Sequence, residues 1–125
     1  MKGVLLYIWQ LPQNMLGLLV ILFSRASRDK QGDIWRTRYY FGVSLGKYIV
    51  VNTKTPLTVL RHERGHQCQS LYLGWLYLIV IGLPSVMGNL MDRWFHKAWP
   101  GSKRYYWYYS LPWEAWADKL GGVVR

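Results

Sequence analysis

The residues with the clearest chemical meaning are His62, Glu63 and His66, which lie in the string H-E-R-G-H. On a helix, residues four positions apart share a face, so both imidazoles can bind one metal ion. A glutamate directly after the first histidine is placed to act as general base on a metal-activated water. This pattern predicts a zinc-dependent hydrolase, and the alternative is a pair of polar histidines on a solvated helix.

A zinc ion that activates water needs a third protein ligand and an open fourth position. Glu114 and Asp118 stand at positions i and i+4, so they share one face of a predicted helix. One carboxylate can then bind the metal while the other bonds a ligand imidazole. The alternative is a surface pair near a helix start, where acids favour the helix dipole. His96 and Asp92 are further candidates for the third ligand, although His96 has aromatic neighbours and is expected mainly at an interface.

Two sets of motifs in this chain resemble known proteins. HERGH with E-A-W-A-D at 114–118 resembles the gluzincin pattern, H-E-x-x-H then E-x-x-A-D, of membrane zinc metallopeptidases such as the CAAX prenyl protease and the heat-shock membrane protease. Residues 62–85 also resemble small bacterial metallopeptidase-like proteins with HE-x-GH-x-x-QS, LG-x-LYL and GLPS. The first resemblance implies zinc ligands His62, His66 and Glu114, the base Glu63, and Asp118 as the residue that orients a ligand imidazole.

Composition places these motifs in an apolar and strongly basic chain. The 125 residues carry a net charge of +10, and 51% are hydrophobic. The length predicts a single domain over 1–125, and the lone Cys68, expected in packing, excludes a disulfide scaffold. Such a charge favours nucleic acid or an anionic membrane, but eight Trp and ten Tyr beside long apolar runs favour the membrane interface. We expect membrane lipid and a peptide or protein substrate as partners, and no nucleic acid.

Two uncharged runs are long enough to cross a bilayer. The run 3–23 carries Gln10, Pro12, Gln13 and Asn14 at its middle, which predicts a kinked, interfacial or re-entrant helix with polar groups that face protein. The run 71–90 contains Gly-Leu-Pro-Ser at 82–85, which predicts a turn in a broken helix. Basic clusters lie on both sides of that second run, so the positive-inside rule favours a re-entrant hairpin or a buried pair of core helices over a single crossing. It places the site and basic loops on the cytoplasmic side.

The remaining elements position the candidate residues. The aromatic and β-branched stretch 39–53 predicts a strand hairpin whose edge could accept an extended peptide, after a basic loop at 25–38. Thr55 and Pro56 begin the H-E-x-x-H helix, 56–73, with Gly74 as its stop, and 110–120 forms the third-ligand helix. Gln69 and Ser70 lie near the histidine face of this helix. They are expected to line the cleft or to hydrogen-bond a ligand, and a purely structural role is the alternative. The candidates for stabilising an oxyanion are Tyr105, Tyr106, Tyr108 and Tyr109.

The sequence therefore predicts an α+β, mostly helical fold: a minimal zincin-like core with apolar, membrane-embedded or interfacial helices. The expected function is zinc-dependent peptide-bond hydrolysis at a membrane interface. The first alternative is a non-catalytic zinc-binding membrane protein that acts as a structural or partner-binding module, which a closed fourth zinc position would favour. The second is a basic domain whose binding to membranes or nucleic acid is lost with salt.

Overall fold

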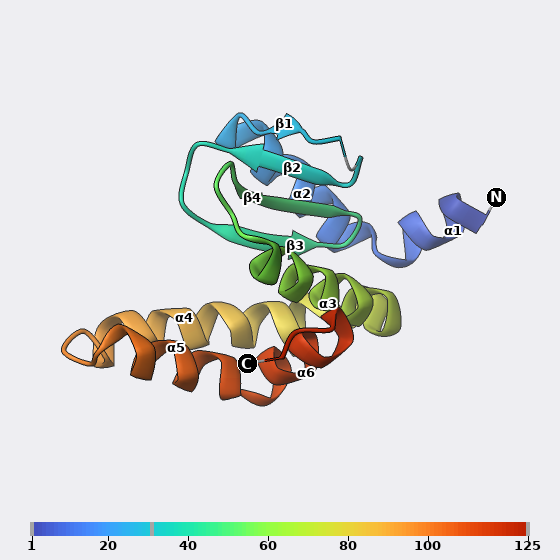
Figure 1. The fold of residues 1–125 in the computed structure, drawn as a ribbon. Coiled ribbons are helices and arrows are strands. Elements are labelled where there is room, and N and C mark those ends of the chain that lie inside the picture. The colour runs from blue at the N-terminus through green and yellow to red at the C-terminus, as the bar shows by residue number, and fades with distance from the viewer. Residues whose placement is uncertain (1, 31, 125) are drawn as a thin grey trace.

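The computed structural model describes residues 2–30 and 32–124 and has a sheet that precedes a central helix, α3 (Figure 1). The α+β, mainly helical class is thereby confirmed. In chain order the elements are α1 (Lys2–Trp9), α2 (Leu11–Ser24), β1 (Ser27–Arg28), β2 (Ile34–Thr37), β3 (Gly42–Leu45), β4 (Tyr48–Asn52), α3 (Leu57–Leu73), a 3₁₀ turn η1 (Gly74–Leu76), a π turn η2 (Leu78–Gly82), α4 (Leu83–Phe95), α5 (Gly101–Ser110) and α6 (Pro112–Gly121).

The four strands form one mixed sheet in the order β1-β2-β4-β3. The predicted hairpin is β3 and β4, joined at Gly46, whose positive φ of 65° suits glycine. The basic stretch 25–38 is a loop only in part, because it supplies the strands β1 and β2. Strand β2 pairs in parallel with β4, a contact between distant segments that no local pattern reveals.

Strand β4 is the centre of the fold because helices cover both of its faces. Ile49 and Val51 form a buried cluster with Ile34 of β2 and Leu60 of α3. Since side chains alternate along a strand, Val50 faces the other way, toward the layer of α2, and is also fully buried. The sheet thus provides α3 with a fixed platform (Figure 1).

The polar cluster in the first apolar run lies at a bend, as predicted. Helices α1 and α2 meet at 87° around Gln10, and the side chains of Gln13 and Asn14 are fully buried against protein. Gln13 donates to Ser70 Oγ at 2.8 Å, and Ser70 Oγ donates to Gln10 Oε1 at 2.6 Å. Asn14 Oδ1 accepts from the backbone N–H of Lys47 at 2.7 Å. This network joins the N-terminal bend to α3 and to the hairpin.

A second bend, of 120°, follows α3. Gly74, the predicted stop, has a φ of 56°, and a Cβ there would lie 2.3 Å from the ring of Trp9. Two tryptophans tie the bends together: Trp9 Nε1 donates to Leu71 O at 2.7 Å, and Trp75 Nε1 donates to Ile8 O at 2.8 Å. The start of α3 falls at Leu57, one residue later than predicted from Pro56.

The turn predicted at 82–85 is wrong. The chain reverses at the 3₁₀ turn, and the helix then continues without a break from η2 into α4. Pro84 lacks an N–H and would crowd a regular α-helix, and the wider π turn before it relieves both problems. Helix α5 was not expected, because its stretch is basic and aromatic without apolar periodicity.

No single helix in the described residues is long and apolar enough to span a membrane. Two bent pairs meet that criterion by length and composition when each pair is taken together: Gly3–Trp9 with Leu11–Ser24, and Leu57–Leu76 with Leu78–Phe95.

Candidate metal centre

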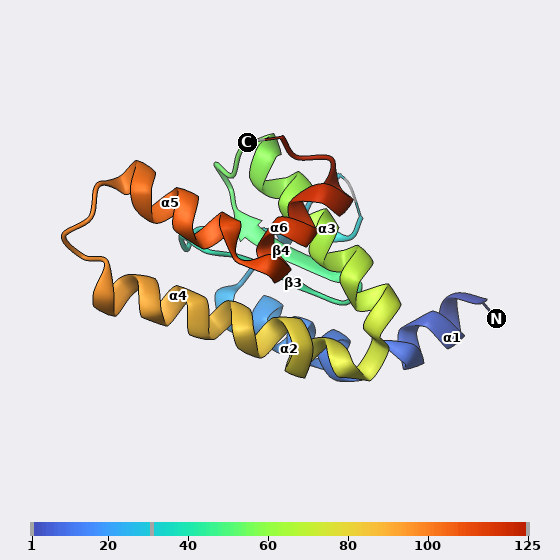
Figure 2. The same cartoon turned by 90° about the horizontal axis from the view of Figure 1, so that it is seen from below.

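Helices α3 and α6 lie side by side and make the most extensive contact between two elements of the described chain (Figure 2). Glycines allow this approach. A Cβ on Gly65 would lie 1.7 Å from the carbonyl oxygen of Ala117, and a Cβ on Gly121 would lie 1.8 Å from that of Arg61. The two backbones are therefore in direct contact, and the ligands on α6 are brought to the histidines on α3.

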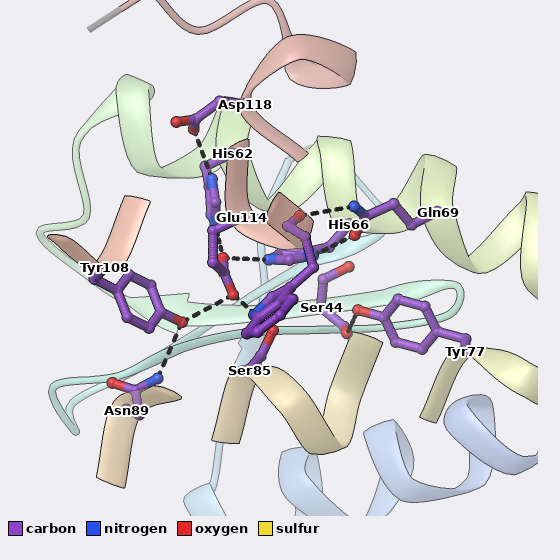
Figure 3. Close-up of polar contacts among 11 residues, drawn as sticks. Ser44, His62, His66, Gln69, Tyr77, Ser85, Asn89, Tyr108, Glu114 and Asp118 are labelled. Carbon is purple, nitrogen blue, oxygen red and sulfur yellow. Dashed lines mark hydrogen bonds and ion pairs between the residues drawn. The ribbon is translucent and has the colours of Figure 1, made fainter. Parts of the chain in front are cut away.

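Three side chains converge at this contact, as Figure 3 shows. Glu114 Oε2 lies 2.8 Å from His62 Nε2 and 3.1 Å from His66 Nε2, and all three residues are buried. Their ligand atoms fall within 4.8 Å of one another. Tetrahedral zinc with bonds of about 2.0–2.1 Å would separate its ligand atoms by about 3.3 Å. The donor set and its spacing therefore fit zinc.

Each histidine is oriented by a partner on its other ring nitrogen. His62 Nδ1 lies 2.7 Å from Asp118 Oδ1, and His66 Nδ1 lies 2.7 Å from Gln69 Oε1. Gln69 Nε2 donates to the carbonyl oxygen of Trp113 at 2.9 Å, which turns the amide oxygen toward His66. Both imidazoles can thus hold a proton on Nδ1 and present the lone pair of Nε2 to a metal.

The second oxygen of Glu114 is also held. Ser85 Oγ donates to Oε1 at 2.6 Å and Tyr108 OH donates to it at 3.1 Å, while Asn89 Nδ2 donates to Tyr108 OH at 3.1 Å. Burial raises the pKa of Glu114, but the bonds from the histidines and Ser85 outweigh burial and hold that pKa well below its ordinary value. Glu114 therefore stays ionised, with one oxygen fixed and the other aimed at the histidines.

Glu63 borders a cleft of about 400 Å³ next to these ligands. One oxygen of its carboxylate lies 3.5 Å from the position that a Cβ on Gly42 would occupy. Burial raises the pKa of Glu63, which the charges of the two histidines only partly offset. A buried carboxylate with a raised pKa beside the ligands is a stronger base than an exposed glutamate. The cleft lining is Gly42, Val59, His62, Glu63, Asn89, Asp92, Gly101, Arg104, Tyr105, Tyr108 and Tyr109.

The charges of the cluster also act on His66. Burial lowers its pKa, but the hydrogen bond to Glu114 and the charge of Glu63 outweigh burial and raise the pKa to about 9. Burial, and then the charge of Glu114, raises the pKa of Tyr108, so its hydroxyl remains a donor. A metal must therefore displace a proton from His66 when it binds.

The other candidates for the third ligand, Asp92 and His96, are not part of the group formed by His62, His66 and Glu114. Asp92 accepts from Arg104 at 2.9 Å, and His96 Nδ1 lies 3.1 Å from Asp92. The ring of His96 stacks on Trp99 with a centroid distance of 3.6 Å and meets Trp107 edge-on, which fits its expected aromatic setting. This cluster joins the ends of α4 and α5.

The structure also gives contacts for the other side chains that were expected near the site. Of the four tyrosines, Tyr108 reaches Glu114 and Tyr109 packs edge-on against His62 at 4.9 Å, whereas Tyr106 is largely exposed. Ser70 belongs to the buried network at the N-terminal bend, and the half-buried Cys68 lies outside the metal group. The contributions missed from the sequence are those of Gly65, Ser85 and Asn89.

No protein-family model, curated protein or solved structure matches this chain.

Proposed function

We propose that this protein is a zinc-dependent peptidase whose ligands are His62, His66 and Glu114 and whose general base is Glu63. The observation that carries the proposal is the convergence of three buried ligand atoms beside a cleft that also contains the Glu63 carboxylate. No fourth His, Cys, Asp or Glu of the described chain joins the group. A site with three protein ligands and a free position favours catalysis over the alternative, a closed structural site.

The residues divide the chemistry between them. Bound zinc would lower the pKa of a coordinated water toward neutrality and polarise the scissile carbonyl. Glu63 takes the proton of the attacking water on its carboxylate and delivers it to the leaving amine. Asp118 fixes the tautomer of His62, and Tyr108 points a hydroxyl donor at the ligand Glu114 from the wall of the cleft.

A peptide substrate is supported by the position of β3. This strand is an edge of the sheet, and Gly42 at its start lines the cleft beside Glu63. The carbonyl of Ser44 is already occupied, because Tyr77 OH donates to it at 2.9 Å. An extended peptide can therefore add to β3 only at the Gly42 end, next to the base.

A membrane setting is part of the proposal. Helices α1 and α2 expose apolar side chains, among them Leu5, Ile8, Leu19 and Leu22, while their polar residues face protein. With a net charge of +10, such a surface suits the interface of an anionic membrane, and we place the site and the basic loops on its cytoplasmic side. A protease-accessibility map that puts the loop at Lys30 and the C-terminal helix on opposite faces would contradict this placement.

The direct test is zinc content together with turnover. Purified protein should contain about one zinc per chain, and His62→Ala and Glu114→Ala should lose it. Glu63→Gln should keep zinc and lose hydrolysis of a peptide library, because the amide cannot accept the proton. A chain that takes up no zinc refutes the site, and a Glu63→Gln variant with unchanged turnover refutes the base.

A further inference from the structure

Helix α4 has an inverted distribution of polar and apolar side chains. Its apolar residues recur at spacings of three and four and form one stripe, as on an amphipathic helix. That stripe faces away from the protein: its members are between 38% and 64% exposed. They are Leu83, Val86, Met87, Leu90, Met91 and Trp94.

The polar side of α4 faces the metal centre instead. Ser85 donates to Glu114, Asn89 donates to Tyr108, and Asp92 binds Arg104 on the cleft wall. Gly88 between them is buried, and a Cβ there would lie 3.0 Å from Leu111. In a monomeric soluble protein the apolar stripe would face the core, so this orientation indicates that a partner covers the stripe.

We propose that the apolar stripe of α4 lies in the headgroup region of an anionic bilayer and that this docking fixes Ser85 and Asn89, so that the lipid surface controls metal binding at Glu114. The docking stands on its own, whereas the control of the site rests on the proposed function.

Charge and position select a lipid surface over a protein partner. The stripe carries no acidic residue, and two exposed cations, Arg93 and Lys97, flank its exposed Trp94 at the end of the helix. Aromatic and basic side chains side by side are typical of the bilayer interface. In Figure 2, α1, α2 and α4 lie along one side of the molecule, away from α6. Three helices on this side of the molecule thus expose apolar side chains.

Coupling to the metal centre follows from how α4 is attached. Its main contacts are with the preceding π turn, with α5 and with α6, and not with the sheet. Its position relative to Glu114 thus depends on few contacts within the chain. A bilayer that holds the stripe also holds Ser85 and Asn89, which occupy successive turns of the opposite face.

The docking test uses vesicles of phosphatidylcholine with phosphatidylglycerol, and phosphatidylcholine alone as the comparison. The wild-type chain should float with the anionic vesicles, and Met87→Asp should weaken this binding about tenfold, because it removes apolar contact and adds a repelled charge. Val124→Asp adds the same charge at an exposed position beyond α6 and should bind as the wild type does. Equal binding of Met87→Asp, or equal binding to both vesicle types, overturns the proposal. So does a dimer that forms without lipid and that Met87→Asp dissociates.

The coupling test measures zinc affinity by competition with a chromophoric chelator. Anionic vesicles should tighten zinc binding by the wild-type chain about tenfold and should leave Met87→Asp unchanged. Ser85→Ala should still float with vesicles yet lose their effect on zinc affinity. If vesicles bind without changing the zinc affinity of the wild type, the control of the site is refuted. If no zinc binds under any condition, the proposed function is refuted. Vesicle flotation still tests separately whether the stripe of α4 docks on the bilayer.

Discussion

Gly65→Ala tests whether backbone contact between α3 and α6 builds the metal centre. The new Cβ would lie 1.7 Å from Ala117 O, and Cβ contacts below 3.0 Å are essentially never observed. The helices must therefore separate locally by the difference, about 1.3 Å. Metal–ligand distances tolerate only about 0.2 Å, so the movement takes Glu114 out of reach of an ion held by the histidines.

We expect two effects of this substitution. Overpacking should lower the free energy of unfolding by about 1–3 kcal/mol. Displacement of a ligand should weaken zinc affinity by at least about a hundredfold, more than the usual effect of changing a residue that only orients a ligand. Chelator competition measures the affinity, and urea unfolding measures the stability.

Two matched glycine variants separate these effects. Gly121→Ala creates a similar clash, 1.8 Å from Arg61 O, but seven residues along α6 from Glu114. It should destabilise the fold comparably and weaken zinc much less. Gly3→Ala has nothing within 4 Å and should change neither property. If Gly65→Ala binds zinc within about threefold of the wild type while folded, the close helix contact does not position the ligand.

Further predictions concern single hydrogen bonds and ion pairs. Asp118→Ala and Gln69→Leu each remove an acceptor from a ligand imidazole and should weaken zinc affinity about 10–100-fold in chelator competition, at unchanged stoichiometry. Tyr108→Phe removes a bond to Glu114 and should cost about tenfold in the same assay. Burial raises the pKa of Asp33, but bonds from Arg64 and Gln67 outweigh it and hold the pKa below its ordinary value. Because the folded state lowers this pKa, the stabilisation is present above about pH 4 and is lost as the pH falls through the lowered value. Urea unfolding should therefore show Asp33→Asn less stable by up to about 1 kcal/mol near pH 7 and equal to the wild type near pH 2. A difference that persists at low pH would contradict the ion pair as its cause.

Local patterns predicted the elements that carry the ligands. The H-E-x-x-H helix and the third-ligand helix each start beside a proline and end at a glycine, signals that depend only on neighbouring residues, and both occur within one or two residues of the expected bounds. The polar residues within the first apolar run correctly indicated a bend, since buried amides need protein partners.

Non-local contacts account for what the sequence did not predict. Strand β2 is short and basic and is stabilised by parallel pairing with β4. Pro84 predicted a turn, but the π turn before it lets the helix continue. The sequence did contain a signal for the close helix contact. Gly65 lies between the two histidines, and glycine destabilises a helix interior, so its presence there indicates that another backbone packs against that position. The sequence contained no comparable signal for Ser85 and Asn89. Their spacing of four residues can be interpreted only when the fold shows that Glu114 lies opposite them.

The two oxygens of Glu114 connect the parts of the molecule. Oε2 faces the histidines of α3, which the sheet supports, and Oε1 is held by Ser85 of α4 and Tyr108 of α5. The position of the carboxylate in the candidate metal group thus depends on both the sheet side and the α4–α5 side. Since the α4–α5 side also presents the exposed apolar stripe, whatever covers that stripe acts on the same carboxylate. A single buried glutamate therefore links the exposed stripe of α4 to the candidate metal site.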